Sequence, residues 1–125
     1  MNARKFLIFA GFALVIIALL GFFGIIGPTP DKSIFGSSWW FDNGENWVHL
    51  VVGLFALFAT QVLSVHAQKY LAMLLGIFGI LIGLYGIVLG NNFLGANLEN
   101  PMDSILHFVL GAWALWASRG KTNNE

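Results

Sequence analysis

Two histidines lie within apolar stretches of the chain, and each follows an acidic residue by four positions. Glu45 precedes His49, and Asp103 precedes His107. A step of four residues places the acid and the histidine on the same face of a helix. Ionisable side chains are rare in apolar helices and usually serve a function where they occur. The two pairs are therefore the first candidates for a functional site.

Ligation of a cofactor is the chemistry that these histidines suggest. Two imidazoles at equal depth on facing helices can hold a metal ion or the iron of a haem, and a chlorophyll-type pigment needs only one of them. Gly53 and Gly111 each follow a histidine by four residues and leave room for a flat macrocycle. We therefore predict His49, His107, Gly53 and Gly111 as cofactor-binding residues for haem, a (bacterio)chlorophyll or a metal ion.

A structural role explains the same residues. Asp42 with Glu45, and Asn100 with Asp103, have the pattern of a helix N-cap followed by an acid at the third helical position. Pro101 would occupy the first helical position, where proline is favoured. On this alternative the acids cap their helices, and the histidines are hydrogen-bonded core residues.

The two histidine segments resemble each other. Residues 45–60 (ENWVHLVVGLFALFAT) align with residues 103–118 (DSILHFVLGAWALWAS) at an offset of 58, with six identities in sixteen positions. A weaker match at an offset of 64 aligns Lys5 with Lys69. We predict an internal repeat of residues 5–60 and 69–118, in which each copy is a helical hairpin. Such copies are parallel repeats related by an axis along the membrane normal.

The aligned segments share one helical stripe of polar and small residues. Its steps of four, four, three and four keep each set on one face, and polar residues at membrane depth normally face the bundle interior. We expect Thr60 and Ser118, like the acids, to support or cap the site. The stripe comprises Glu45, His49, Gly53, Ala56 and Thr60 in the first copy, and Asp103, His107, Gly111, Ala114 and Ser118 in the second.

The composition indicates a membrane protein. Hydrophobic residues make up 58% of the 125 residues and charged residues 10%, whereas a soluble domain carries about 25% charged residues. Apolar stretches at about residues 6–26, 45–65, 70–89 and 101–118 approach the roughly 20 residues of a membrane span. We predict an all-α membrane protein, one domain over residues 1–125, with four transmembrane helices. The short polar turn at 66–69 should make the second and third helices antiparallel neighbours.

The distribution of basic residues predicts how the protein is oriented in the membrane. Five of the six basic residues, namely Arg4, Lys5, Lys69, Arg119 and Lys121, flank one side of this topology, and Lys32 is the exception. The positive-inside rule places both termini in the cytoplasm of a bacterial plasma membrane or a membrane derived from it. The loops at 27–44 and 90–100 then face outward, and the aromatic run 39–41 should lie at the outer interface.

A glycine groove marks the third predicted helix. Glycines on one helical face let another backbone approach closely. We expect the helix at 6–26 to fill this groove, with an external helix as the alternative. The groove comprises Gly76, Gly79, Gly83, Gly86 and Gly90.

Several functional classes lack support in the sequence. The chain has no cysteine, a formal net charge of zero and no basic run typical of nucleic-acid binding. It contains no phosphate-binding loop, nucleophile elbow or metalloprotease motif, and the loops are too short for a soluble catalytic domain. We therefore expect no enzymatic activity and no nucleic-acid partner.

The repeated H-x-x-x-G segments at 45–53 and 103–111 resemble a family of small bacterial four-helix membrane proteins, classed as a domain of unknown function, family 4383. The resemblance implies a bacterial origin and a four-helix fold, and it supplies no activity. The second copy departs from the family pattern at Ser104, where the first has Asn46. Asn46 is therefore a further site candidate.

Three functions remain open at this point. The first is a non-enzymatic accessory or scaffolding subunit that contacts lipid and packs against other transmembrane helices in a homo- or hetero-oligomer. The second is a cofactor carrier with His49 and His107 as ligands. The third is proton or solute translocation through the same residues.

Overall fold

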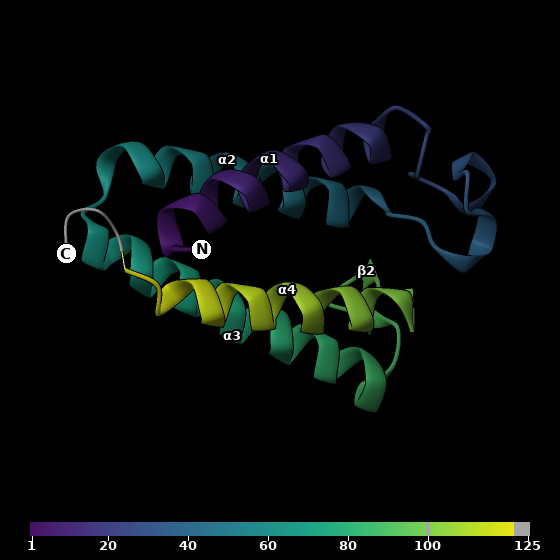
Figure 1. Ribbon diagram of the computed structural model, residues 1–125. Helices are drawn as coiled ribbons and strands as arrows, with labels where there is room; N and C mark the ends of the chain where they lie inside the picture. The colour runs from purple at the N-terminus through teal and green to yellow at the C-terminus, as the bar shows by residue number, and fades with distance from the viewer. Residues whose placement is uncertain (100, 122–125) are drawn as a thin grey trace.

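Four α-helices make up most of the protein in a computed structural model, which describes residues 1–99 and 101–121 (Figure 1). The prediction of an all-helical fold is confirmed. The loop before α2 contains two short 3-10 turns, η1 (Pro30–Lys32) and η2 (Gly36–Ser38), and two short strands pair antiparallel before α4, β1 (Asn92–Phe93) and β2 (Ala96–Asn97). The helices are α1 (Ala3–Phe22), α2 (Asn43–Val62), α3 (Val65–Leu89) and α4 (Met102–Ser118).

Local capping shifts several helix boundaries from their predicted positions. α1 ends at Phe22 rather than residue 26, and the chain then turns through Gly24 with φ +80°. α3 begins at Val65 rather than residue 70 because the Ser64 side chain accepts a hydrogen bond from the Ala67 backbone N–H at 3.2 Å. The predicted turn at 66–69 is therefore the start of α3. Pro101 precedes α4 instead of beginning it, and Asn100 lies outside the described residues.

Three helices, α1, α2 and α3, are long and apolar enough to cross a membrane. α4 has 17 residues, which is the short limit for a span. Large apolar side chains remain exposed on these helices, among them Phe55, Phe78 and Trp116 at 52%, 60% and 63%. Such exposure is expected where lipid replaces water as the solvent.

Each helix packs most closely against one partner, α1 against α2 and α3 against α4. A Cβ on Gly53 would lie 2.8 Å from the Gly11 carbonyl oxygen, and one on Gly111 would lie 2.8 Å from that of Gly76. The backbones of each pair are therefore in direct contact, as small residues permit. The predicted neighbours α2 and α3 do not pack side by side within the described part of the chain, because the glycine faces direct each helix to another partner.

The glycine groove of α3 receives α4 and not α1, which corrects the predicted partner. A Cβ on Gly79 would lie 3.2 Å from the His107 carbonyl oxygen, and one on Gly83 would lie 3.1 Å from that of Ser104. Gly86 is buried. Gly90 does not belong to the groove: it ends α3 with φ +101°, and a Cβ there would meet no described atom within 4 Å.

The same contacts recur in the two hairpins. In the first, Leu57 of α2 packs over Gly11; in the second, Leu115 of α4 packs over Gly76. These contacts relate α2 to α4 by the predicted offset of 58. They relate α1 to α3 by 65, since Gly11 corresponds to Gly76, rather than by the 64 that aligning the two lysines suggested.

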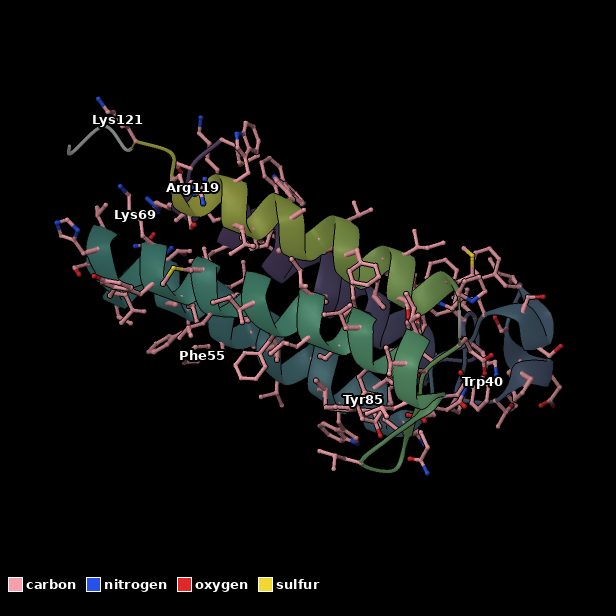
Figure 2. All side chains as sticks on the ribbon, turned by 90° about the horizontal axis from the view of Figure 1, so that it is seen from below. Trp40, Phe55, Lys69, Tyr85, Arg119 and Lys121 are labelled. Atoms are coloured by element: carbon pink, nitrogen blue, oxygen red, sulfur yellow. The ribbon has the colours of Figure 1, made fainter. Side chains whose placement is uncertain are left out.

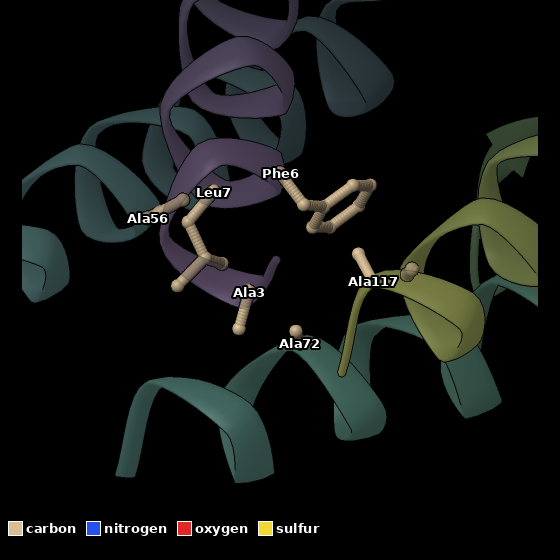
Figure 3. Packing of buried hydrophobic residues seen from close by; sticks show 7 residues of the cluster. Ala3, Phe6, Leu7, Ala56, Ala72 and Ala117 are labelled. Carbon is tan, nitrogen blue, oxygen red and sulfur yellow. The ribbon is translucent and has the colours of Figure 1, made fainter. Parts of the chain in front are cut away.

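The hairpins meet in a hydrophobic core (Figure 3), at the end of the molecule where α1 begins and α4 ends. The ring of Phe6 contacts that of Trp113 edge to face, with centroids 5.0 Å apart. Lys69, Arg119 and Lys121 lie at this basic end, and Trp40 and Tyr85 lie toward the other (Figure 2). The core comprises Ala3, Phe6, Leu7, Ala56, Ala72, Ala114 and Ala117.

Candidate functional site

Polar side chains gather at the end of the molecule away from the basic end, where α2 and α4 begin. They come from two stretches of the chain: the loop before α2 with the first turn of α2, and β2 and the loop after it with the first turn of α4. We call this group the cap cluster. It comprises Trp39, Asp42, Glu45, Asn97, Glu99 and Asp103.

Asp42 caps α2 and connects it to the other hairpin. Its Oδ1 accepts a hydrogen bond from the Glu45 backbone N–H at 2.8 Å, and Glu45 Oε2 accepts from the Asp42 backbone N–H at 3.1 Å. The predicted capping box is therefore confirmed. Asp42 Oδ2 also accepts from the backbone N–H of Asn97 at 2.6 Å, so one carboxylate joins α2 to β2.

Asp103 makes the corresponding connection from α4. Its side chain is buried, Oδ1 accepts from Trp39 Nε1 at 2.8 Å, and Oδ2 accepts from the Glu99 backbone N–H at 2.7 Å. Two members of the aromatic run 39–41 pack within the protein, and the placement of the run at the outer interface stays a prediction. Trp39 is half-buried and bonded to Asp103, and Phe41 is buried.

The two acids of the histidine segments meet each other. The side chains of Glu45 and Asp103 are both buried and lie close enough to interact. The first turns of α2 and α4 therefore approach each other at their acids.

His49 and His107 lie one helical turn further along α2 and α4 than the two acids. Both side chains are half-buried, and they lie close enough to each other to interact electrostatically. His107 Nδ1 donates to the backbone oxygen of Asp103 at 2.7 Å; a carbonyl can only accept, so Nδ1 carries a hydrogen. Nε2 of a neutral His107 ring then bears the lone pair. The His49 ring contacts Phe41 edge to face, and its Nδ1 is buried with no hydrogen-bond partner among the described residues.

The other predicted site residues serve helix packing. The open faces of Gly53 and Gly111 are filled by α1 and α3, so neither glycine leaves the space for a macrocycle that the sequence suggested. Thr60 and Ser118 do not support the histidines. Each lies eleven residues further along its helix and donates its hydroxyl to a carbonyl of the same helix, on Leu57 and Leu115, at 2.7 Å.

Asn46 holds α1 against α2. Its side chain is fully buried, and a Cβ on Gly21 would lie 1.9 Å from its Oδ1. Asn46 Nδ2 donates to the Phe41 backbone oxygen at 3.3 Å, while Oδ1 has no hydrogen-bond partner among the described residues. The buried Ser104 takes the equivalent place in α4.

Sequence reasoning missed Trp39, Asn97 and Glu99 as members of the cluster. These residues lie in loops, where no periodicity indicates which side chains face inward. The one available signal was that Asp42 and Glu99 fall in the two loops predicted to face outward, and that Glu45 and Asp103 closely follow these loops; acids that are buried there must find donors.

Metal binding finds little support in the arrangement of these groups. Among the described residues, no group of three or more histidine and acidic side chains is placed to hold a metal ion. A ligand at this site would depend on the two imidazoles.

The comparisons with known proteins give no match. No protein-family model matches the chain, and no curated protein or solved structure is significantly similar to it. The resemblance to family 4383 therefore rests on the residues at 45–53 and 103–111 and stays a prediction.

Proposed function

We propose that this protein is a non-enzymatic accessory or scaffolding subunit of a membrane assembly. One observation carries the proposal: the half-buried Asp42 and the buried Asp103 each accept a hydrogen bond from the other hairpin. A catalytic carboxylate must reach a substrate, whereas Asp42 and Asp103 are occupied by donors of the protein itself. Their role is to fix two loops and two hairpins into one rigid cap.

The proposal places all four helices across the bilayer, α4 included. The basic end lies in the cytoplasm and the cap cluster outside, in a bacterial plasma membrane or a membrane derived from it, because basic residues favour the cytoplasmic side. The contacts that recur around Gly11 and Gly76 support an origin by duplication of one hairpin. The pseudo-twofold axis would then run along the membrane normal.

Partners would bind on the apolar helix faces. The glycine faces are filled within each hairpin, so the surface available to another transmembrane helix consists of larger side chains such as Phe55 on α2 and Phe78 on α3. Van der Waals packing and interhelical hydrogen bonds drive association between helices in lipid. The partner is a second copy of this chain or another membrane protein.

Site-directed photo-cross-linking in membranes of the native host tests this proposal. A benzoyl-phenylalanine at Phe55, Phe78 or Trp116 samples the exposed faces of α2, α3 and α4, and the same residue at the buried Phe6 is the matched control. We expect at least one exposed position to give a discrete protein adduct of higher mass, and Phe6 to give none. Lipid adducts alone at all three exposed positions, with a monomer on native gels, would contradict the proposal.

The second candidate is a cofactor carrier, and the histidines supply the observation that favours it. Ligating histidines usually donate their other ring N–H to a carbonyl or carboxylate, as His107 Nδ1 does to the Asp103 carbonyl. The buried Nδ1 of His49 has no hydrogen-bond partner in the part of the chain that the structure describes, and it would gain one if a ligand bound there. Proton or solute translocation has no specific observation in its favour.

A further inference from the structure

An apolar groove of about 450 Å³ runs along α3. Phe78, Ile82, Tyr85 and Leu89 line it at steps of four, three and four residues, which places them on one face of the helix. Phe93 of β1 lines the groove near the end of α3, and its ring contacts that of Tyr85 edge to face, with centroids 4.9 Å apart. The groove therefore lies between a helix and the hairpin of β1 and β2.

The groove extends over the half of α3 that is nearer the cap cluster. Leu89 follows Phe78 by eleven positions, which is about 16 Å along the helix axis. The hydrocarbon core of a bilayer is about 30 Å thick, so one leaflet contributes about 15 Å. The length of the groove therefore matches the depth of one leaflet.

The lining of the groove favours a hydrocarbon ligand. Among the described residues, those that line it are all apolar or aromatic, and none is charged. The single side-chain hydroxyl, on Tyr85, already donates to the Asn92 backbone oxygen at 2.7 Å. A polar or charged ligand would therefore find no free side-chain partner there.

The hairpin of β1 and β2 carries an exposed leucine at its tip. Leu94 and Gly95 form its two-residue turn, with φ +51° and +91°. Glycine and asparagine adopt positive φ readily, whereas leucine rarely does. Leu94 is 93% exposed, and no residue from 92 to 97 is charged. An apolar side chain that is held in this conformation without burial in the protein indicates a contact outside it.

The direction of the hairpin distinguishes a lipid from a partner helix. Figure 2 shows the hairpin projecting sideways from the end of α3, beside Tyr85. With α3 across the bilayer, this direction lies in the plane of the membrane. A transmembrane helix in the groove would have to continue past the end of α3, through the space that the hairpin occupies. A lipid ends at the interface and needs no such space.

We propose that the groove binds one acyl chain of a phospholipid in the leaflet at the cap-cluster end, and that Leu94 inserts into the same leaflet. The chain lies between Phe78 and Leu89 and contacts the ring of Phe93 near the headgroup. The hairpin thus holds a lipid against α3. This site requires that α3 crosses the bilayer. It does not depend on the scaffolding function, for which the exposed faces of α2 and α4 remain available.

Native mass spectrometry of the purified full-length protein tests the acyl-chain site. The probe is phosphatidylcholine, which has no net charge, added to the delipidated protein in detergent. Leu84→Trp fills the groove, and Leu54→Trp on α2 is the matched control, since the two leucines are 46% and 52% exposed. We expect one lipid per chain in the parent, about tenfold weaker binding in Leu84→Trp, and less than about twofold weaker binding in Leu54→Trp.

A nitroxide at position 94 tests the insertion of the hairpin tip. The chain has no native cysteine, so Leu94→Cys and the control Asp31→Cys, in an exposed part of the loop before α2, each give a single labelling site. In phosphatidylcholine liposomes, we expect the label at 94 to be more accessible to oxygen, which concentrates in hydrocarbon, than to a water-soluble nickel chelate. The label at 31 should show the opposite order.

Any of three results would overturn the lipid site. Equal losses of lipid in Leu84→Trp and Leu54→Trp would mean that lipid covers the helices without a specific site. Preferential access of the nickel chelate to position 94 would place the hairpin tip in water. A protein adduct from a benzoyl-phenylalanine at Leu84 in native membranes would identify a partner helix in the groove. Circular dichroism of each variant must match the parent, and if Leu84→Trp unfolds, Phe93→Ala should give the same loss of lipid.

Discussion

Replacing Gly111 with leucine should separate α4 from α3, whereas the same change at the adjacent Ala112 should leave the fold intact. A Cβ on Gly111 would lie 2.8 Å from the Gly76 carbonyl oxygen and 3.1 Å from the Ile80 backbone nitrogen. Backbone atoms on the facing helix cannot rotate away as a side chain can. Overpacking typically costs about 1–3 kcal/mol, and the leucine also adds three carbons beyond Cβ, so we expect the upper end of this range or more.

The measurement is reversible unfolding in mixed micelles, followed by circular dichroism. Ala112 is exposed next to Gly111, so Ala112→Leu controls for adding the same side chain to α4. Gly53→Leu should resemble Gly111→Leu, because its Cβ would lie 2.8 Å from the Gly11 carbonyl oxygen in the other hairpin. Equal stability of Gly111→Leu and Ala112→Leu would contradict the direct backbone contact between α3 and α4.

Replacing Asp103 with leucine should detach the loops of the cap cluster from α4. Trp39 Nε1 and the Glu99 backbone N–H would both lose their acceptor, and each unsatisfied buried donor costs about 1–3 kcal/mol. We therefore expect a loss of about 2–4 kcal/mol, since part of each cost is recovered when water enters. Asp103→Asn should cost less, because its amide oxygen can still accept from one of the two donors.

Hydrogen exchange of the Trp39 indole N–H, measured by NMR, reports on the cap cluster locally. This proton should exchange slowly in the parent protein and rapidly in Asp103→Leu. Asp31→Asn is the matched control, since Asp31 is an exposed acid in the loop before α2. Slow exchange in Asp103→Leu would mean that the loop is held without the bond to Asp103.

The long helices were predictable because their apolar runs dominate the sequence, whereas their ends were not. The Ser64 cap extends α3 into a polar segment that the composition assigned to a turn. Glycine spacing correctly indicated close packing along α3, but spacing describes one face and does not identify the helix that fills it. The partner proved to be α4.

The candidate site, too, could be predicted from the sequence only in part. The capping role of Glu45 follows from its distance to Asp42 along the chain, and the structure has both hydrogen bonds. The bonds from Trp39 to Asp103 and from Asn97 to Asp42 join residues more than fifty positions apart. Such contacts are set by the packing of two hairpins, which no local pattern in the sequence records.

The visible absorption spectrum of the protein purified from membranes of its native host tests the central claim, that the polar cluster joins the hairpins and does not hold a chromophore. The scaffolding proposal predicts a colourless protein that migrates in a larger complex. A visible band at near-stoichiometric amount would contradict it, above all if His49→Leu or His107→Leu removed the band while circular dichroism showed that the helices still form.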